Sequence, residues 1–270
     1  MESVKLPMEK LKSYILEAEE RIYNDIRKIY PNSAGLDGII NIDRYLDLNH
    51  EISNEKTIKI LWFLKERAFP TNKKNQEFDV RQLMLYVAEY SKWRMTYGNM
   101  CSVTEGILEW WRTRNSKYLH LENLPELKVE GGSVYYMTNE EASKQIFPLD
   151  FTAFLNVQKR GIFSKTSNQN LLYAEYAKPE IQKILKAQYE YINPDIIIFA
   201  NHIEKLAEDF AGIKLSDFTV CGSCKYYFDK QINKLFIYTH HPNLHGQVTK
   251  EDYCNSIFEA VLINQKFLLK

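Results

Sequence analysis

Residues 58–64 have the sequence IKILWFL, a continuous apolar run bounded by charged and turn-forming residues. Such a run is typical of a β-strand that is covered on both faces. Three further runs of this kind follow, at residues 150–157 (DFTAFLNV), 195–200 (DIIIFA) and 234–239 (KLFIYT). The sequence therefore predicts four buried core strands.

Amphipathic helices are predicted between and around these strands. Residues 7–30 carry apolar side chains at helical spacing, and residues 171–192 form a second such segment, in which Pro179 should start or kink part of the helix. Asp79 and Thr249 each precede a helical segment and are expected to cap it. Strands that alternate with helices predict an α/β protein, a three-layer α/β/α arrangement around a central, mostly parallel four-stranded sheet.

The 270 residues are expected to form a single domain with two additions. Residues 1–56 would be a helical N-terminal extension. Residues 79–147 would be a helical and loop insertion between the first and second core strands, with a helix through the sequence GILEWW and a short helix at residues 139–147.

The composition limits the classes of protein to which this chain is expected to belong. Lys plus Arg and Asp plus Glu number 35 each, so net charge neither demands nor excludes a nucleic-acid partner. The charged N-terminal segment lacks the apolar core of a signal peptide and the length of a membrane span. Four scattered cysteines do not form a secreted disulfide framework. We expect a cytoplasmic protein without a membrane partner.

Polar side chains follow three of the predicted strands. Lys65, Glu66 and Arg67 follow the first strand, residues 156–160 end the second with Asn156, Lys159 and Arg160, and residues 240–243 (HHPN) follow the fourth. Parallel α/β sheets bind ligands beyond the carboxyl ends of their strands. A carboxylate, a carboxamide and an imidazole are therefore expected to meet in one crevice.

These same segments resemble the uracil-DNA glycosylase superfamily, in a divergent bacterial branch, over residues 57–244. ILWFLKERAFP resembles the first motif, a strand running into a Gly-Gln/Glu-x-Pro turn. AFLN resembles the second strand, whose final Asn reads the flipped base, and LKAQYEYINPDIIIFAN resembles the helix and strand that follow. THHPN resembles the late His-Pro-Ser motif.

The resemblance implies a DNA glycosylase that hydrolyses the N-glycosidic bond of a flipped-out damaged or modified base, in DNA repair or in defence against phage DNA. No cofactor and no metal are expected, nor an obligatory protein partner; the partner is single- or double-stranded DNA. The implied catalytic residues are Glu66, His241 and Asp79, and the base-recognition residues are Asn156, Phe69 and Phe78. The implied DNA-binding residues are Lys65, Arg67, Lys73, Lys74, Arg81, Lys159, Arg160, His240 and Asn243.

Bond cleavage places positive charge on the sugar and negative charge on the departing base. His241 would donate a hydrogen bond to the base, and Glu66, or with less support Asp79, would stabilise the sugar and orient water. Asn156 offers both a donor and an acceptor to a Watson–Crick edge.

The sequence departs from the family pattern in a way that leaves two other functions open. Lys65 replaces the glycine of the first motif, Arg67 stands where the best-known members carry the water-activating Asp, and Asn243 replaces the usual Ser. One alternative is therefore a catalytically inactive nucleic-acid or nucleotide-binding module of the same fold. The other is an unrelated doubly wound enzyme that acts on a free nucleotide.

Each candidate also has a structural interpretation. Glu66 can pair with Arg67 or Arg81, and Asn156 can close a turn. The pair Cys221-x-x-Cys224 has metal-ligand spacing but lacks a second close pair, which favours a β-turn. Trp110 and Trp111 are expected in a helix core rather than in a base-stacking platform.

Overall fold

The computed structural model describes residues 8–48, 57–65, 77–79, 81, 94–124, 148–160, 169–200, 203–244, 246 and 248–270. Its main sheet has seven strands in the order β2-β5-β3-β6-β9-β8-β7. The α/β class is confirmed. The predicted four-stranded sheet is corrected to a seven-stranded one, because antiparallel strands extend it at both edges.

The four predicted runs are neighbours in the middle of this sheet and are parallel to one another. They are β3 (Ile60–Leu64), β5 (Thr152–Asn156), β6 (Ile196–Phe199) and β9 (Lys234–Tyr238). Every residue of β3, β5 and β6 is buried, as expected for strands covered on both faces. Because the strands are parallel, their carboxyl ends meet at one edge of the sheet.

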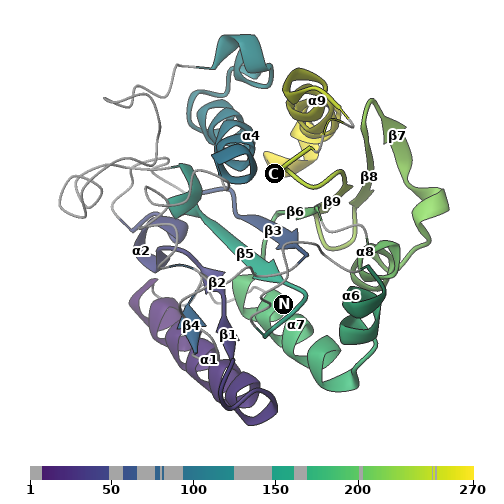
Figure 1. Cartoon of the computed structure of the whole chain (residues 1–270). Helices are drawn as coiled ribbons and strands as arrows, with labels where there is room; N and C mark the ends of the chain where they lie inside the picture. The colour runs from purple at the N-terminus through teal and green to yellow at the C-terminus, as the bar shows by residue number, and fades with distance from the viewer. Residues whose placement is uncertain are drawn as a thin grey trace.

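Alternate residues of each core strand enter two separate hydrophobic cores. Trp62, Phe154 and Ile198 pack on the side of α4 (Arg94–Thr113) and α9 (Lys250–Leu268). Phe63 and Phe199 stack on the other side, which α1 (Met8–Ile29), α7 (Pro179–Ile192) and α8 (Glu204–Ala211) cover. Figure 1 shows the resulting three layers, with α4 and α9 above the sheet and α1 and α7 below it.

Helix boundaries follow the residues that the sequence marks. The segment predicted at residues 171–192 is two helices, α6 (Gln169–Tyr176) and α7, and Pro179 is the first residue of α7. The hydroxyl oxygen of Thr249 accepts the backbone N–H of Asp252 at 3.0 Å and caps α9. Within the described residues, every helix is too short or too polar to cross a membrane.

The N-terminal extension is more than helical. After α1, the short strands β1 (Gly35–Leu36) and β2 (Gly38–Ile39) form, and β2 becomes the edge strand beside β5. Gly38 has φ +149°, and a Cβ there would lie 2.8 Å from both Glu19 Oε1 and the Tyr191 hydroxyl. A side chain is strained at this φ and would also have to displace the ends of these two side chains, so glycine is favoured here. The helix α2 (Ile42–Tyr45) completes the extension.

The insertion begins within β4 (Phe78–Asp79), which pairs with β1, and continues with α4 and the short 3-10 helices Ser116–Tyr118 and Leu121–Asn123. Trp110 and Trp111 are buried in α4, so the core interpretation of this pair is confirmed. The helix predicted after Asp79 is described only at Arg81 before residue 94, and the short helix at residues 139–147 lies outside the described residues. A 3-10 helix, Pro148–Phe151, leads into β5. The remaining strands are β7 (Thr219–Cys221) and β8 (Cys224–Asp229), preceded by the 3-10 helix Leu215–Asp217.

Glu105 in α4 gives the stability a specific pH dependence. Burial, reinforced by the negative charge of Glu109, raises the pKa of Glu105 from its ordinary 4.5 to about 7. Between these values the folded protein holds a proton that the unfolded chain has released. The contribution of Glu105 to stability is therefore fully present below pH 4.5 and is lost as pH rises through 7.

We predict that Glu105→Gln removes this loss. The variant should gain stability relative to the wild type as pH rises from 4.5 to 8, measured by urea unfolding at each pH. Exposed Glu17→Gln is the control and should track the wild type. A difference between Glu105→Gln and the wild type that stays constant with pH would contradict the assignment.

Candidate functional site at the carboxyl edge of the sheet

The carboxyl edge of the parallel strands has a polar group at each end. Asn156 is the last residue of β5, and the His241 turn (residues 240–244) follows β9. The strands β3 and β6 lie between them (Figure 1). Three inter-strand spacings separate β5 from β9, roughly 14 Å. The candidate site is the part of the sheet edge that lies between these two groups.

The first group is the Asp37 cluster, formed by Asp37, Asn156, Lys159 and Gln188. Asp37 Oδ2 accepts the backbone N–H of Asn156 at 2.7 Å and lies 3.4 Å from Asn156 Nδ2. Asp37 Oδ1 accepts Lys159 Nζ at 2.7 Å and Gln188 Nε2 at 3.0 Å. Asp37, Lys159 and Gln188 are 0% exposed, and Asn156 is 2% exposed. This is a buried ion pair whose carboxylate is fully engaged by donors.

The cluster continues into a second ionic group, which joins the insertion to the extension. Arg81 binds Asp79 through Nε and Nη2, at 2.9 and 2.6 Å, and reaches Glu19 Oε2 and the carbonyl of Ile39. Burial raises the pKa of Glu19, although Arg81 opposes the shift. Burial lowers the pKa of Arg81, but the Asp79 hydrogen bond and nearby acidic charge outweigh burial and raise it overall. Tyr191 donates to Glu19 and Tyr23 to the carbonyl of Asp37, which joins the two groups.

These contacts alter the roles expected for three residues. Lys159 was expected to bind DNA phosphate, but it is completely buried and paired with Asp37, so this expectation is corrected. Arg81 and Asp79 are each other's partners, with side chains 21% and 17% exposed. Asp79 also accepts the backbone N–H of Arg81 at 2.9 Å, as a capping residue does. Arg160 is exposed, as a phosphate-binding role requires.

The second group, the His241 turn, holds its imidazole by backbone contacts. The backbone N–H of Asn243 donates to His241 Nδ1 at 3.2 Å, and Leu244 N–H donates to the carbonyl of His241 at 2.9 Å. Asn99 in α4 donates from Nδ2 to the carbonyl of Pro242 at 2.6 Å and anchors the turn. Because Nδ1 is an acceptor here, the neutral ring carries its proton on Nε2.

Beside the His241 turn, a hollow of about 290 Å³ opens over the ends of β8 and β9, where Lys225, Tyr238 and His240 contribute to its walls. Its lining also includes the two-residue turn Gly222-Ser223 between Cys221 and Cys224, which pair across β7 and β8. The β-turn interpretation of this cysteine pair is confirmed, and both thiols contact the carbonyl of Ser256.

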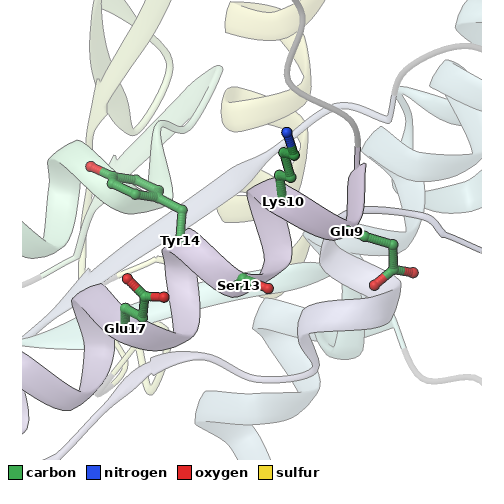
Figure 2. Close-up of a pocket in the computed structure, with 5 residues that line it drawn as sticks. All are labelled: Glu9, Lys10, Ser13, Tyr14 and Glu17. Carbon is green, nitrogen blue, oxygen red and sulfur yellow. The ribbon is translucent and has the colours of Figure 1, made fainter.

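A second hollow, shown in Figure 2, is lined by residues that are distant in the sequence from Asn156 and the His241 turn. Its lining residues, Glu9, Lys10, Ser13, Tyr14 and Glu17, all belong to the first turns of α1. In Figure 2 their side chains spread along the helix without converging on a common point. We assign no chemistry to this surface.

Several predicted site residues lie outside the described part of the chain. They are Glu66, Arg67, Phe69, Lys73 and Lys74. Lys65 is described directly after β3, where its carbonyl accepts Gln158 N–H at 3.2 Å. Phe78 is described through its backbone, which pairs with Gly35.

Four polar residues in or next to these two groups were not expected from the sequence: Asp37, Gln188, Glu19 and Asn99. Asp37 stands between glycines in a stretch whose composition indicates only a turn. Gln188 and Glu19 lie on the buried faces of amphipathic helices, and a polar residue on an apolar face is the signal that could have revealed them. Asn99 gave no comparable signal.

We predict that Lys159→Met destabilises the fold by about 3 to 5 kcal/mol, because it leaves the Asp37 carboxylate buried without its counter-charge. The double variant Asp37→Asn with Lys159→Met should recover most of that loss, since it removes both charges. Urea unfolding of both single variants and the double variant gives the coupling energy. A loss below about 1 kcal/mol for Lys159→Met would show that the pair does not hold this edge together.

No family model, no curated protein and no solved structure matches the chain. The chemistry of this edge therefore rests on its own side chains. Those are a fixed carboxamide at one end, an oriented imidazole at the other, and a buried ion pair behind the carboxamide.

Proposed function

We propose that the protein is a DNA glycosylase that hydrolyses the N-glycosidic bond of a flipped-out damaged or modified base. The observation that carries the proposal is the arrangement of Asn156 and His241 at the same edge of the parallel sheet, with β3 and β6 between them. Ligands of such sheets bind beyond the carboxyl ends of the strands. The resemblance in the ILWFLKERAFP, AFLN and THHPN segments supports the same assignment.

His241 would stabilise the departing base. When the glycosidic bond breaks, negative charge develops on an oxygen of the base, and a fixed donor lowers the barrier to cleavage. The contact from Asn243 N–H to His241 Nδ1 directs the proton of the neutral ring to Nε2, so the imidazole can donate there. Asn99 holds the turn that carries this imidazole, so the donor would be oriented before the substrate arrives.

Asn156 would read the flipped base. A carboxamide offers a carbonyl oxygen and an NH₂ group side by side, which matches a donor and acceptor pair on a base. One N–H of Asn156 is directed toward Asp37, and the second N–H and Oδ1 would serve the base. Recognition of this kind requires the nucleotide to leave the duplex stack.

Glu66 would stabilise the positive charge that develops on the sugar. Glu66 follows Lys65 in the sequence and lies outside the described residues; the strand that precedes it, β3, lies between the two groups in the strand order. Asp79 is the weaker candidate because Arg81 binds both of its oxygens. Arg160, which is exposed next to the Asp37 cluster, would contact a flanking phosphate.

One observation favours a second candidate, the catalytically inactive nucleic-acid or nucleotide-binding module. Asn156 is only 2% exposed, and a carboxamide so enclosed requires rearrangement nearby before it meets a base. Arg67, in place of the water-activating Asp of the first motif, fits the same alternative.

One assay separates the two functions. The protein is incubated with single- and double-stranded oligonucleotides, each bearing one deaminated, oxidised or otherwise modified base, and alkali then cuts the strand wherever a base was lost. The glycosylase proposal expects alkali-labile sites with at least one base. Binding without such sites on every substrate would favour the inactive module, and activity on mononucleotides alone would favour an enzyme of free nucleotides.

We predict that His241→Ala and Asn156→Ala each reduce base release by about 100- to 1,000-fold, the range for losing one preorganised donor. Single-turnover rates on the best substrate of the survey measure the loss, and circular dichroism checks the fold. Exposed His120→Ala and Asn123→Ala are the matched controls and should retain wild-type rates. Wild-type rates in His241→Ala and Asn156→Ala would remove these residues from the mechanism.

A further inference from the structure

One oxygen of the Asp37 carboxylate contacts both the backbone and the side chain of Asn156. Its Oδ2 receives the backbone N–H of Asn156 at 2.7 Å and is 3.4 Å from the side-chain nitrogen of the same residue. Asp37 comes from the N-terminal extension, 119 residues earlier in the chain. The extension therefore supplies the group against which the candidate base reader rests.

A carboxylate restricts how the Asn156 carboxamide can point. An ionised carboxylate only accepts hydrogen bonds, so the NH₂ group of Asn156 is favoured next to Asp37, and the carbonyl oxygen is repelled from that position. Flipping the carboxamide by 180° would place two acceptors against each other in a site closed to water. The position of Asp37 thus selects one of the two carboxamide orientations.

The Asp37 side chain is itself held in one orientation by its other contacts. Lys159 and Gln188 bind its other carboxylate oxygen at 2.7 and 3.0 Å, and all three side chains are completely buried. The hydroxyl of Tyr23 donates to the carbonyl of Asp37 at 3.2 Å and fixes its backbone as well. The positive charge of Lys159 offsets part of the free-energy cost of burying the Asp37 carboxylate.

We propose that Asp37 is a positioning residue that sets base specificity by locking the orientation of the Asn156 carboxamide. The proposal rests on the glycosylase function. Keto and amino bases differ in which atom of the Watson–Crick edge donates and which accepts, so they require opposite carboxamide orientations. A locked carboxamide discriminates between the two classes, whereas a carboxamide free to flip accepts both.

The test measures discrimination rather than rate. Single-turnover base release is compared on matched oligonucleotides that carry the preferred base of the survey or its keto or amino counterpart. Asp37→Asn removes the charge, and its single carbonyl oxygen cannot accept from both Lys159 and Asn156, so the preference for the NH₂ group of Asn156 at this position is lost. The ratio of the two rates should fall about tenfold or more, the size expected when a hydrogen bond to a charged group is lost.

Two further variants separate positioning from stability. Glu19→Gln is the matched control: it makes the same carboxylate-to-amide change in the neighbouring buried group, where Glu19 contacts Arg81 and Tyr191, and it should leave the ratio unchanged. The double variant Asp37→Leu with Lys159→Met removes the acceptor without leaving an unpaired buried charge. It replaces Asp37→Asn in the test if Asp37→Asn does not fold. It should lower the ratio as well.

The outcomes distinguish the two proposals. If the wild type releases no base from any substrate, the glycosylase function fails, and the specificity role of Asp37 fails with it. If the wild type discriminates and the folded Asp37 variants keep the same ratio at any overall rate, only the positioning role is overturned. An equal fall in the ratio for Glu19→Gln would assign the effect to general loosening and would also overturn it.

Discussion

The ion pair between Asp37 and Lys159 is the interaction on which the arrangement of this edge depends. Removing two charges from water is costly, and the cost is offset only because donors from Asn156 and Gln188 complete the carboxylate shell. The pair joins residues 122 positions apart and draws the extension onto the carboxyl end of β5. The pairing of β2 with β5 and the close approach at Gly38 belong to the same contact.

The sequence predicted those parts of the fold that are determined by local pattern. Runs such as residues 195–200 are apolar throughout because both faces of the strand are covered, so their position is visible without the rest of the chain. The short strands β1, β2 and β4 have no such pattern, since two residues cannot show a period. Contacts of Asp37 and Glu19 with residues far away in the chain hold the segment of β1 and β2 in place, so these strands depend on tertiary rather than local contacts. Of the three short strands only β2 belongs to the main sheet, and the antiparallel strands β7 and β8 are the other two that the predicted four lacked.

The location of the candidate site residues was predictable to a similar extent. The rule that ligands bind at the carboxyl ends of parallel strands located the edge, and Asn156 and the His241 turn both lie there. The prediction for Lys159 was wrong for a physical reason. A lysine that follows a strand can extend into solvent or pair with a buried carboxylate, and the local sequence is the same in both cases. Only the position of Asp37 decides between the two, and nothing around Asp37 in the sequence points to its partner.

The buried pair also bears on the choice between the two proposed functions. A module that only holds nucleic acid needs surface cations and stacking faces, and neither depends on the orientation of a single carboxamide. The Asp37 cluster instead places three polar residues out of water around Asn156, an arrangement that costs solvation and restricts one side chain. Restricting that side chain matters most where two hydrogen-bonding patterns must be told apart. The geometry behind Asn156 therefore favours a site that recognises a particular base over a surface that binds any strand.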